Sequence, residues 1–248
     1  MKKVFKKVLF TSIFMFCIFL VRAQGIEISV TAKIAPPPLP TYVQPPCPAD
    51  GYIWTPGYWA FDEATGEYYW VPGVWVAPPA PDLLWTPPYW AFVNGVYDFY
   101  PGYWGTEVGF YGGINYGFGY FGVGFSGGRW ISNVFHYNTA VVNVNKTAVH
   151  HVYVDKTAVN KPLAANRASF NGEGGIRSNP THAETQAVKQ NRQQPTREQE
   201  TQVNNAKADK DEFLSKNHGT PTKMSMDKVG GEHFNPKGQK IRKLSNNK

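Results

Sequence analysis

The sequence predicts a mainly β protein with an α-helical tail: a meander of aromatic β-hairpins, a segment of short strands, polar helices and a disordered C-terminus. One aromatic hexad occurs four times at steps of 16, 15 and 14 residues, and a short fixed period indicates a repeated supersecondary unit. The stretch that follows the hexads alternates glycine with aromatic residues, a composition that favours strands over helices. Beyond residue 178 the chain becomes polar and carries motifs that cap helices.

Residues 1–23 predict a secretory signal peptide. Four lysines precede a mostly apolar run from Val8 to Val21, and small residues allow cleavage after Ala23. This run is shorter than the roughly 20 residues that a membrane-spanning helix needs. We therefore expect an exported protein located in the periplasm, in the outer membrane or at the cell surface.

Residues 24–50 predict one strand and a proline-rich spacer. Apolar and polar residues alternate from Ile26 to Val30, and residues 35–48 have the proline content of a stiff, extended connector. Only Cys47 survives removal of the signal peptide, so no disulfide can form within the chain. An inert thiol, an intermolecular disulfide and a reactive thiol all stay open for this residue.

Residues 51–128 hold the hexads and a run rich in glycine and aromatic residues. Each hexad has an aromatic residue at both ends and Pro-Gly or Pro-Pro at its centre, which predicts a corner between short strands. Asn94-Gly95 between β-forming residues predicts a tight hairpin turn. In residues 105–128 we expect strands in which the aromatic and apolar residues move from even to odd positions near Tyr120. A close-packed helix is the alternative, but glycine disfavours it. The hexads are residues 54–59, 70–75, 85–90 and 99–104, and they contain seven of the eight tryptophans.

Residues 129–177 predict short strands, because Thr-Ala-Val segments recur after asparagine or aspartate turns. Residues 178–219 predict two polar helices, near 181–193 and 196–217, each opened by a capping box. With so few apolar residues these helices should be loosely docked or free. Residues 220–248 predict a basic, disordered tail.

The charge is unevenly distributed. The formal net charge of +7 includes five positive charges in the signal peptide. Residues 24–160 hold 4 basic and 9 acidic side chains, whereas residues 161–248 hold 16 and 9. A mildly acidic aromatic half is thus followed by a basic polar half. An exported chain of this kind gives no reason to expect a nucleic-acid partner.

The aromatic residues of the hexads are the candidate binding residues. Tryptophan and tyrosine rings stack on the apolar faces of sugars, while their N–H and O–H groups donate hydrogen bonds. The alternative is that the same rings fill a core that has few aliphatic residues. Buried rings in all copies would favour this structural interpretation. The candidate platform comprises Trp54, Tyr58, Trp59, Trp70, Trp75, Trp85, Tyr89, Trp90, Tyr103 and Trp104.

No residue pattern indicates catalysis, a metal or a cofactor. Asp62, Glu63 and Glu67 fall near a predicted hairpin tip, where exposure makes a solubilising turn the expected role. His150 and His151 are adjacent in a predicted strand and would point to opposite faces. We therefore expect a protein that is not an enzyme and that has no metal site.

The double-tryptophan spacing resembles the WXXGXW (also YXWGXW) repeat family of exported bacterial envelope proteins. Residues 54–59 and 70–75 fit the pattern, whereas the third hexad has Pro88 in place of glycine and the fourth begins with Phe99. The resemblance implies export and a repeat architecture, and it carries over no catalytic residue.

These observations lead us to expect a structural or interaction module of the bacterial envelope. Its aromatic repeats would contact a glycan or an envelope protein. The alternative is a self-assembling or membrane-associated element driven by the glycine- and aromatic-rich strands of residues 105–128, because exposed flat strands template their own pairing.

Overall fold

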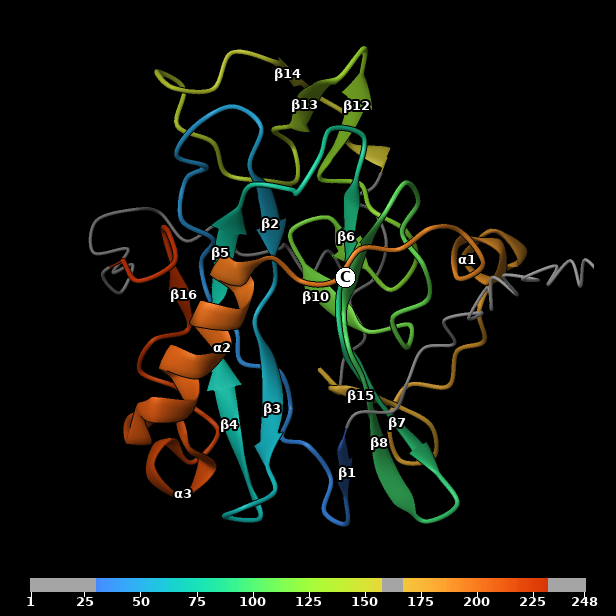
Figure 1. Cartoon of the computed structure of the whole chain (residues 1–248), viewed down its shortest axis with the longest axis vertical. Helices are drawn as coiled ribbons and strands as arrows, with labels where there is room; N and C mark the ends of the chain where they lie inside the picture. Colours follow the sequence, from blue (N-terminus) through green and yellow to red (C-terminus); the bar gives the residue numbers. More distant parts are fainter. Residues whose placement is uncertain (1–29, 158–166, 232–248) are drawn as a thin grey trace, which may run out of the picture.

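The computed structural model describes residues 30–157 and 167–231, and the predicted signal peptide lies outside them. The fold is mainly β, with short helices near the C-terminus, as predicted. Two long hairpins lie side by side at its centre, and helix α2 (Arg197–Ala208) packs against the first of them (Figure 1). A three-stranded sheet covers one end of the molecule (Figure 1).

Each central hairpin is built from two hexads, one in each arm. In both hairpins the inner and outer strand pairs keep one register, so the proline of each hexad interrupts an arm without ending the hairpin. The predicted corner is therefore corrected to an interruption within an arm. The first hairpin contains β2 (Ile53–Thr55), β3 (Tyr58–Asp62), β4 (Glu67–Val71) and β5 (Gly73–Val76), and the second contains β6 (Leu84–Thr86), β7 (Tyr89–Val93), β8 (Val96–Tyr100) and β9 (Tyr103–Gly105).

The aromatic ends of paired hexads meet across the strands. In the first hairpin the ring centroids of Trp59 and Trp70 lie 5.3 Å apart at an interplanar angle of 68°. Tilted and edge-to-face aromatic pairs contribute about 0.5–1.5 kcal/mol beyond the area that they bury. Three further pairs complete the set: Trp54–Trp75, Trp85–Trp104 and Trp90–Phe99.

The glycine of a hexad makes room for the tryptophan of its partner hexad. A methyl group on Gly73 would lie 2.6 Å from Cζ2 of Trp54, and one on Gly57 would overlap the ring of Trp70. Neither glycine has a positive φ, so space rather than backbone conformation requires it. In the second hairpin Pro88 occupies the equivalent position, where the ring across the strands is Phe99. Pro88 and Phe99, the two residues that depart from the hexad pattern, thus lie on facing arms of the second hairpin, at the positions that Gly57 and Trp70 hold in the first.

The hexad indoles also hold distant parts of the chain. Their N–H groups donate to acceptors in the proline-rich segment, the C-terminal segment, the neighbouring hairpin and α2, so one residue type joins four regions. The bonds are Trp59 to the Pro38 carbonyl at 3.2 Å, Trp75 to Pro45 at 2.8 Å, Trp70 to Met224 at 3.1 Å, Trp90 to Trp59 at 2.8 Å and Trp104 to Oε1 of Gln199 at 2.8 Å.

The proline-rich segment, residues 35–48, is extended as predicted but packs on the hairpins instead of acting as a spacer. Its carbonyl groups accept the two indole bonds and two bonds from the Arg167 guanidinium. Cys47 is fully buried, and burial raises its pKa to about 12, which favours an inert thiol. Before this segment, β1 (Val30–Ala32) pairs with β8, and the rest of the predicted strand lies outside the described residues.

The glycine- and aromatic-rich run forms a small folded unit on the second hairpin. Its strands, β10 (Asn115–Gly117) and β11 (Tyr120–Phe121), pair with each other across a turn at Phe118 and Gly119. Both turn residues have positive φ, and no helix forms within residues 105–128. Tyr111, Tyr116 and Tyr120 are buried. The run therefore presents no long flat strand to a second molecule.

Residues 129–177 contain short strands and turns, as predicted. Asn138, Asn145 and Asp155 each accept a hydrogen bond from the backbone N–H two residues later, so the three Thr-Ala-Val segments begin with the same local turn. The strands are β12 (Gly128–Ile131), β13 (Val134–Asn138), β14 (Val152–Tyr153) and β15 (Phe170–Asn171).

Both predicted capping boxes are present, at Thr181 with Glu184 and at Thr196 with Gln199. The helices are shorter than predicted, because Asp209 ends α2 and Phe213 turns back to stack on Tyr69. Four elements accompany α2: α1 (His182–Ala187), the 3-10 helix η2 (Lys210–Glu212), α3 (Leu214–Asn217) and β16 (Ser225–Met226). Strand β16 pairs with β5, which corrects the prediction of disorder for residues 220–231. Residues 232–248 lie outside the described range.

Helix α2 docks through polar side chains, which corrects the expectation of a loose or free helix. Gln202 donates to the Pro72 carbonyl at 3.2 Å, and Lys207 Nζ lies 2.9 Å from an Asp62 carboxylate oxygen. Asp62 is only 5% exposed, and its hydrogen bond with Lys207 holds its pKa below the ordinary value. Asp62 therefore anchors the helix and is not merely a solubilising turn residue. Within residues 30–157 and 167–231, no helix combines the length and apolarity needed to span a membrane.

Replacing Gly57 with alanine is expected to lower the free energy of unfolding by about 1–3 kcal/mol, because the new methyl group overlaps the Trp70 ring. Urea unfolding would measure the change. Gly105→Ala is the matched control, since its methyl would meet nothing closer than the Glu107 carbonyl oxygen at 3.3 Å. Equal losses in the two variants would contradict the proposed role of Gly57.

Stability is expected to fall as pH rises through 7, because burial raises the pKa of Glu212 to about 7. The fold tolerates the protonated Glu212 carboxyl better than the ionised one. Its contribution to stability is therefore fully present below pH 4.5, where the side chain is protonated in both states, and is lost as pH rises from 4.5 through 7. Glu212→Gln should gain on the order of 3 kcal/mol relative to wild type between pH 5 and 8. Melting temperatures test this, with the exposed Glu198→Gln as control. Parallel pH profiles for wild type and Glu212→Gln would refute it.

Candidate functional site

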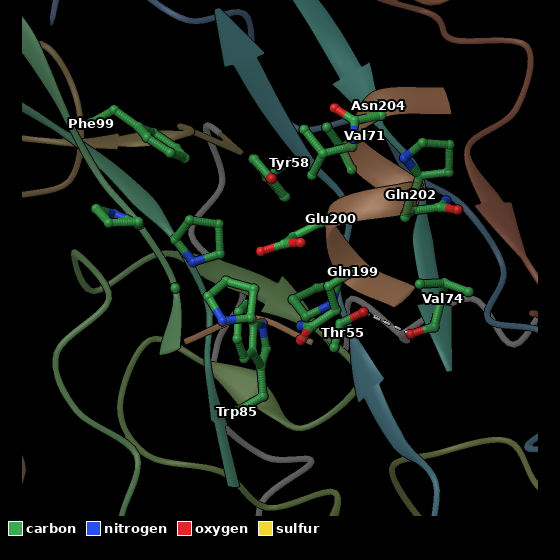
Figure 2. Close-up of a pocket in the computed structure, with 17 residues that line it drawn as sticks. Thr55, Tyr58, Val71, Val74, Trp85, Phe99, Gln199, Glu200, Gln202 and Asn204 are labelled. Carbon is green, nitrogen blue, oxygen red and sulfur yellow. Dashed lines mark hydrogen bonds between the residues drawn. The ribbon is translucent and has the colours of Figure 1, made fainter. Parts of the chain in front are cut away.

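A cavity of about 380 Å³ lies where the interruptions of the two hairpins meet beneath α2. We call it the hexad cavity. Every hexad contributes to its wall, and one face of α2 closes it (Figure 2). Its lining consists of Thr55, Pro56, Tyr58, Val71, Pro72, Val74, Trp85, Pro88, Phe99, Pro101, Gly102, Pro195, Gln199, Glu200, Gln202, Val203 and Asn204.

Prolines from both hairpins form part of the apolar wall. Pro56 and Pro72 come from the first hairpin, and Pro88 and Pro101 come from the second. Each stands where an arm is interrupted, and a proline there offers no backbone N–H to the cavity. The same residue that breaks each strand thus gives the cavity a surface poor in hydrogen-bond donors.

Aromatic rings cover another side of the cavity. Tyr58 from the first hairpin stacks on Phe99 from the second, with ring centroids 5.9 Å apart and an interplanar angle of 20°. Burial raises the pKa of the Tyr58 phenol above its ordinary value, so this hydroxyl stays protonated at neutral pH. The indole of Trp85 forms a further part of the lining.

The Glu200 carboxylate projects from α2 into the cavity (Figure 2). The helix is held in this orientation by Gln199, which accepts the Trp104 indole N–H, and by Gln202, which donates to Pro72. Glu200 itself forms no ion pair or side-chain hydrogen bond with any residue in the described ranges. The site therefore combines an apolar wall with one unpaired carboxylate.

The predicted aromatic platform is mostly buried in the core. All seven hexad tryptophans are at most 5% exposed, and Tyr89 and Tyr103 are also buried. Burial in every copy favours the structural interpretation of these rings. Of the ten candidate residues, only Tyr58 and Trp85 line the hexad cavity. A binding role for the whole set stays a prediction.

Sequence reasoning missed the prolines, Glu200 and Asn204 as site residues. The prolines carried a usable signal, because Pro56, Pro72 and Pro101 recur at the third position of their hexads, Pro88 stands at the fourth position of its own, and each removes a strand donor. Glu200 follows the second capping box, but nothing local in the sequence shows which face of α2 meets the hairpins. The site thus depends on contacts between residues more than 90 positions apart, such as Trp104 and Gln199.

The histidines do not assemble a recognisable metal centre. His150 Nδ1 lies 2.9 Å from Asp50, whereas the His151 ring faces His136 at a centroid distance of 5.2 Å. In the part of the chain that the structure describes, no three His, Cys, Asp or Glu side chains gather as metal ligands. The expected absence of a metal and of catalysis stays a prediction.

Comparison with known proteins identifies one motif. Residues 50–76 match the WXXGXW repeat in two copies. The matched segment contains β2 to β5, so two copies of the repeat correspond to one complete hairpin with its paired tryptophans. Comparisons with curated proteins and with solved structures give no match.

Proposed function

We propose that this protein is an exported, non-enzymatic envelope module that binds a glycan in the hexad cavity. The observation that carries the proposal is a cavity of about 380 Å³ to which all four hexads contribute and into which one carboxylate projects. Ligand sites are typically cavities of about 300–1,000 Å³ with largely apolar walls and a few polar groups. The export signal predicted in residues 1–23 supports an envelope location.

The lining suits a sugar ring. The apolar face of the ring can pack on prolines and on Trp85, while its hydroxyl groups reach polar side chains at the edge of the cavity. Tyr58 offers a phenolic donor, Asn204 offers an amide, and Glu200 offers a carboxylate acceptor. A protein partner would instead need a contact of roughly 800 Å² on each side, which is far larger than this concave site.

The alternative of self-assembly through residues 105–128 receives less support. Tyr111, Tyr116 and Tyr120 of this run are buried, and their hydroxyl groups donate to backbone carbonyls at 2.9, 2.5 and 3.0 Å. These aromatic groups are engaged within the fold. A flat strand available for pairing, which that alternative requires, does not form in this run.

Glycan binding is tested by isothermal titration of residues 24–248 with two soluble tetrasaccharides, one of β-1,4-linked N-acetylglucosamine and one of glucosamine. We expect saturable binding of at least one of them. Asn204→Trp places a large ring at the cavity lining and should weaken binding about tenfold or more.

Asn205→Trp provides the control, because it adds the same ring to an exposed neighbouring position on α2 that does not line the cavity. This variant should bind as wild type does. No binding to either tetrasaccharide, or equal losses in the two variants, would contradict the proposal.

A further inference from the structure

We infer that the hexad cavity selects a glycan carrying a free, protonated amine, with the Glu200 carboxylate as the partner of that ammonium group. This inference rests on the proposed glycan function and names the class of sugar that the same site takes. It is carried by the charge, the hydrogen-bonding groups and the wall of the cavity.

Among the described residues that line the cavity, Glu200 alone has a charged side chain. Its carboxylate projects inward (Figure 2), and no cationic side chain within the described residues pairs with it. Glu200 is exposed, so water reaches its carboxylate, but the cavity wall that it faces offers it no counter-charge. A ligand with a positive charge would supply the missing counter-charge, whereas a neutral ligand would leave it unpaired.

The hydrogen-bonding capacity of the carboxylate points to the same kind of ligand. Gln202 also belongs to the cavity lining, but it is 3% exposed and its Oε1 is buried, so it is not an acceptor that a ligand can reach. The Glu200 carboxylate is an accessible acceptor that lacks a donor among the described residues. An ammonium group has three donors and no acceptor, so it complements this carboxylate better than a hydroxyl or an acetamide does.

The apolar wall adds to this preference. The prolines contribute no N–H donors that would compete for an anion or repel a cation. Tyr58, Phe99 and Trp85 also line the cavity, and aromatic rings attract ammonium groups. The same surface can pack against the carbon atoms of a sugar ring. Charge and shape together therefore fit an amino sugar better than its N-acetylated form.

The test compares the two tetrasaccharides at pH 6 and low salt, where the glucosamine tetramer is cationic and the N-acetylglucosamine tetramer is neutral. Wild type should bind the cationic tetramer about tenfold more tightly, as one charge-assisted hydrogen bond allows. Glu200→Gln should bind both tetramers equally within about twofold.

Glu198→Gln is the matched control, because it removes one exposed carboxylate from the same helix without altering the cavity lining. This variant should keep the preference of wild type. Glu200 is itself exposed, so its replacement should leave the melting temperature nearly unchanged.

The outcomes separate the two proposals. Equal binding of both tetramers by wild type, or an unchanged preference in Glu200→Gln, would overturn amine selection and leave glycan binding intact. No binding of either tetramer would overturn both. Binding of a lysine peptide but of neither tetramer would show a cation site for a different ligand, and it would also overturn the inference as stated.

Discussion

The fold depends on tryptophan rings that cross from one arm of a hairpin onto the glycine of the other. The glycine leaves the space, the neighbouring proline interrupts the strand, and the ring fills the gap. In the first hairpin this arrangement occurs twice, with Trp70 over Gly57 and Trp54 over Gly73. Because each interruption is filled by its partner, the arms resume in the same register after it. A long hairpin can therefore contain a proline in every arm.

The same rings organise the rest of the chain through their indole N–H groups. A buried indole that lacks an acceptor is costly. Five of the seven hexad indoles donate to an acceptor, whereas Trp54 Nε1 has no partner among the described residues. The proline-rich segment supplies carbonyl groups, and α2 supplies Gln199. This explains why segments with little hydrophobic content pack closely. They contribute hydrogen-bond acceptors in addition to a few buried apolar side chains, such as Leu39 of the proline-rich segment and Ala206 of α2.

Structure and proposed function are divided between different residues of one motif. The tryptophans are buried and hold the hairpins together, whereas the prolines face the hexad cavity. A rigid wall is useful in a binding site, because a ligand then loses less affinity to ordering of the protein. Within this framework Glu200 comes from a separate helix, so changes at that position could alter selectivity without disturbing the paired rings.

The sequence was informative wherever structure follows from local chemistry. The repeat period, Asn94-Gly95 and both capping boxes predicted hairpins, a turn and helix starts that the structure contains. It was uninformative about which hexads pair, because that choice depends on register between distant strands. The docking of α2 was missed because glutamine contacts do not raise the apolar content of a helix. The hexad cavity, which forms only after these contacts, could not be predicted.

The most direct measurement concerns the two departures from the repeat in the second hairpin, Pro88 and Phe99. If a ring requires glycine across the strand, then a smaller ring at Phe99 is what permits Pro88. A double-mutant cycle with Phe99→Trp and Pro88→Gly measures this coupling by urea unfolding. We predict that Phe99→Trp alone costs about 1–3 kcal/mol and that adding Pro88→Gly recovers at least about 1 kcal/mol of it. Effects that add within about 0.5 kcal/mol would contradict the pairing of ring and glycine.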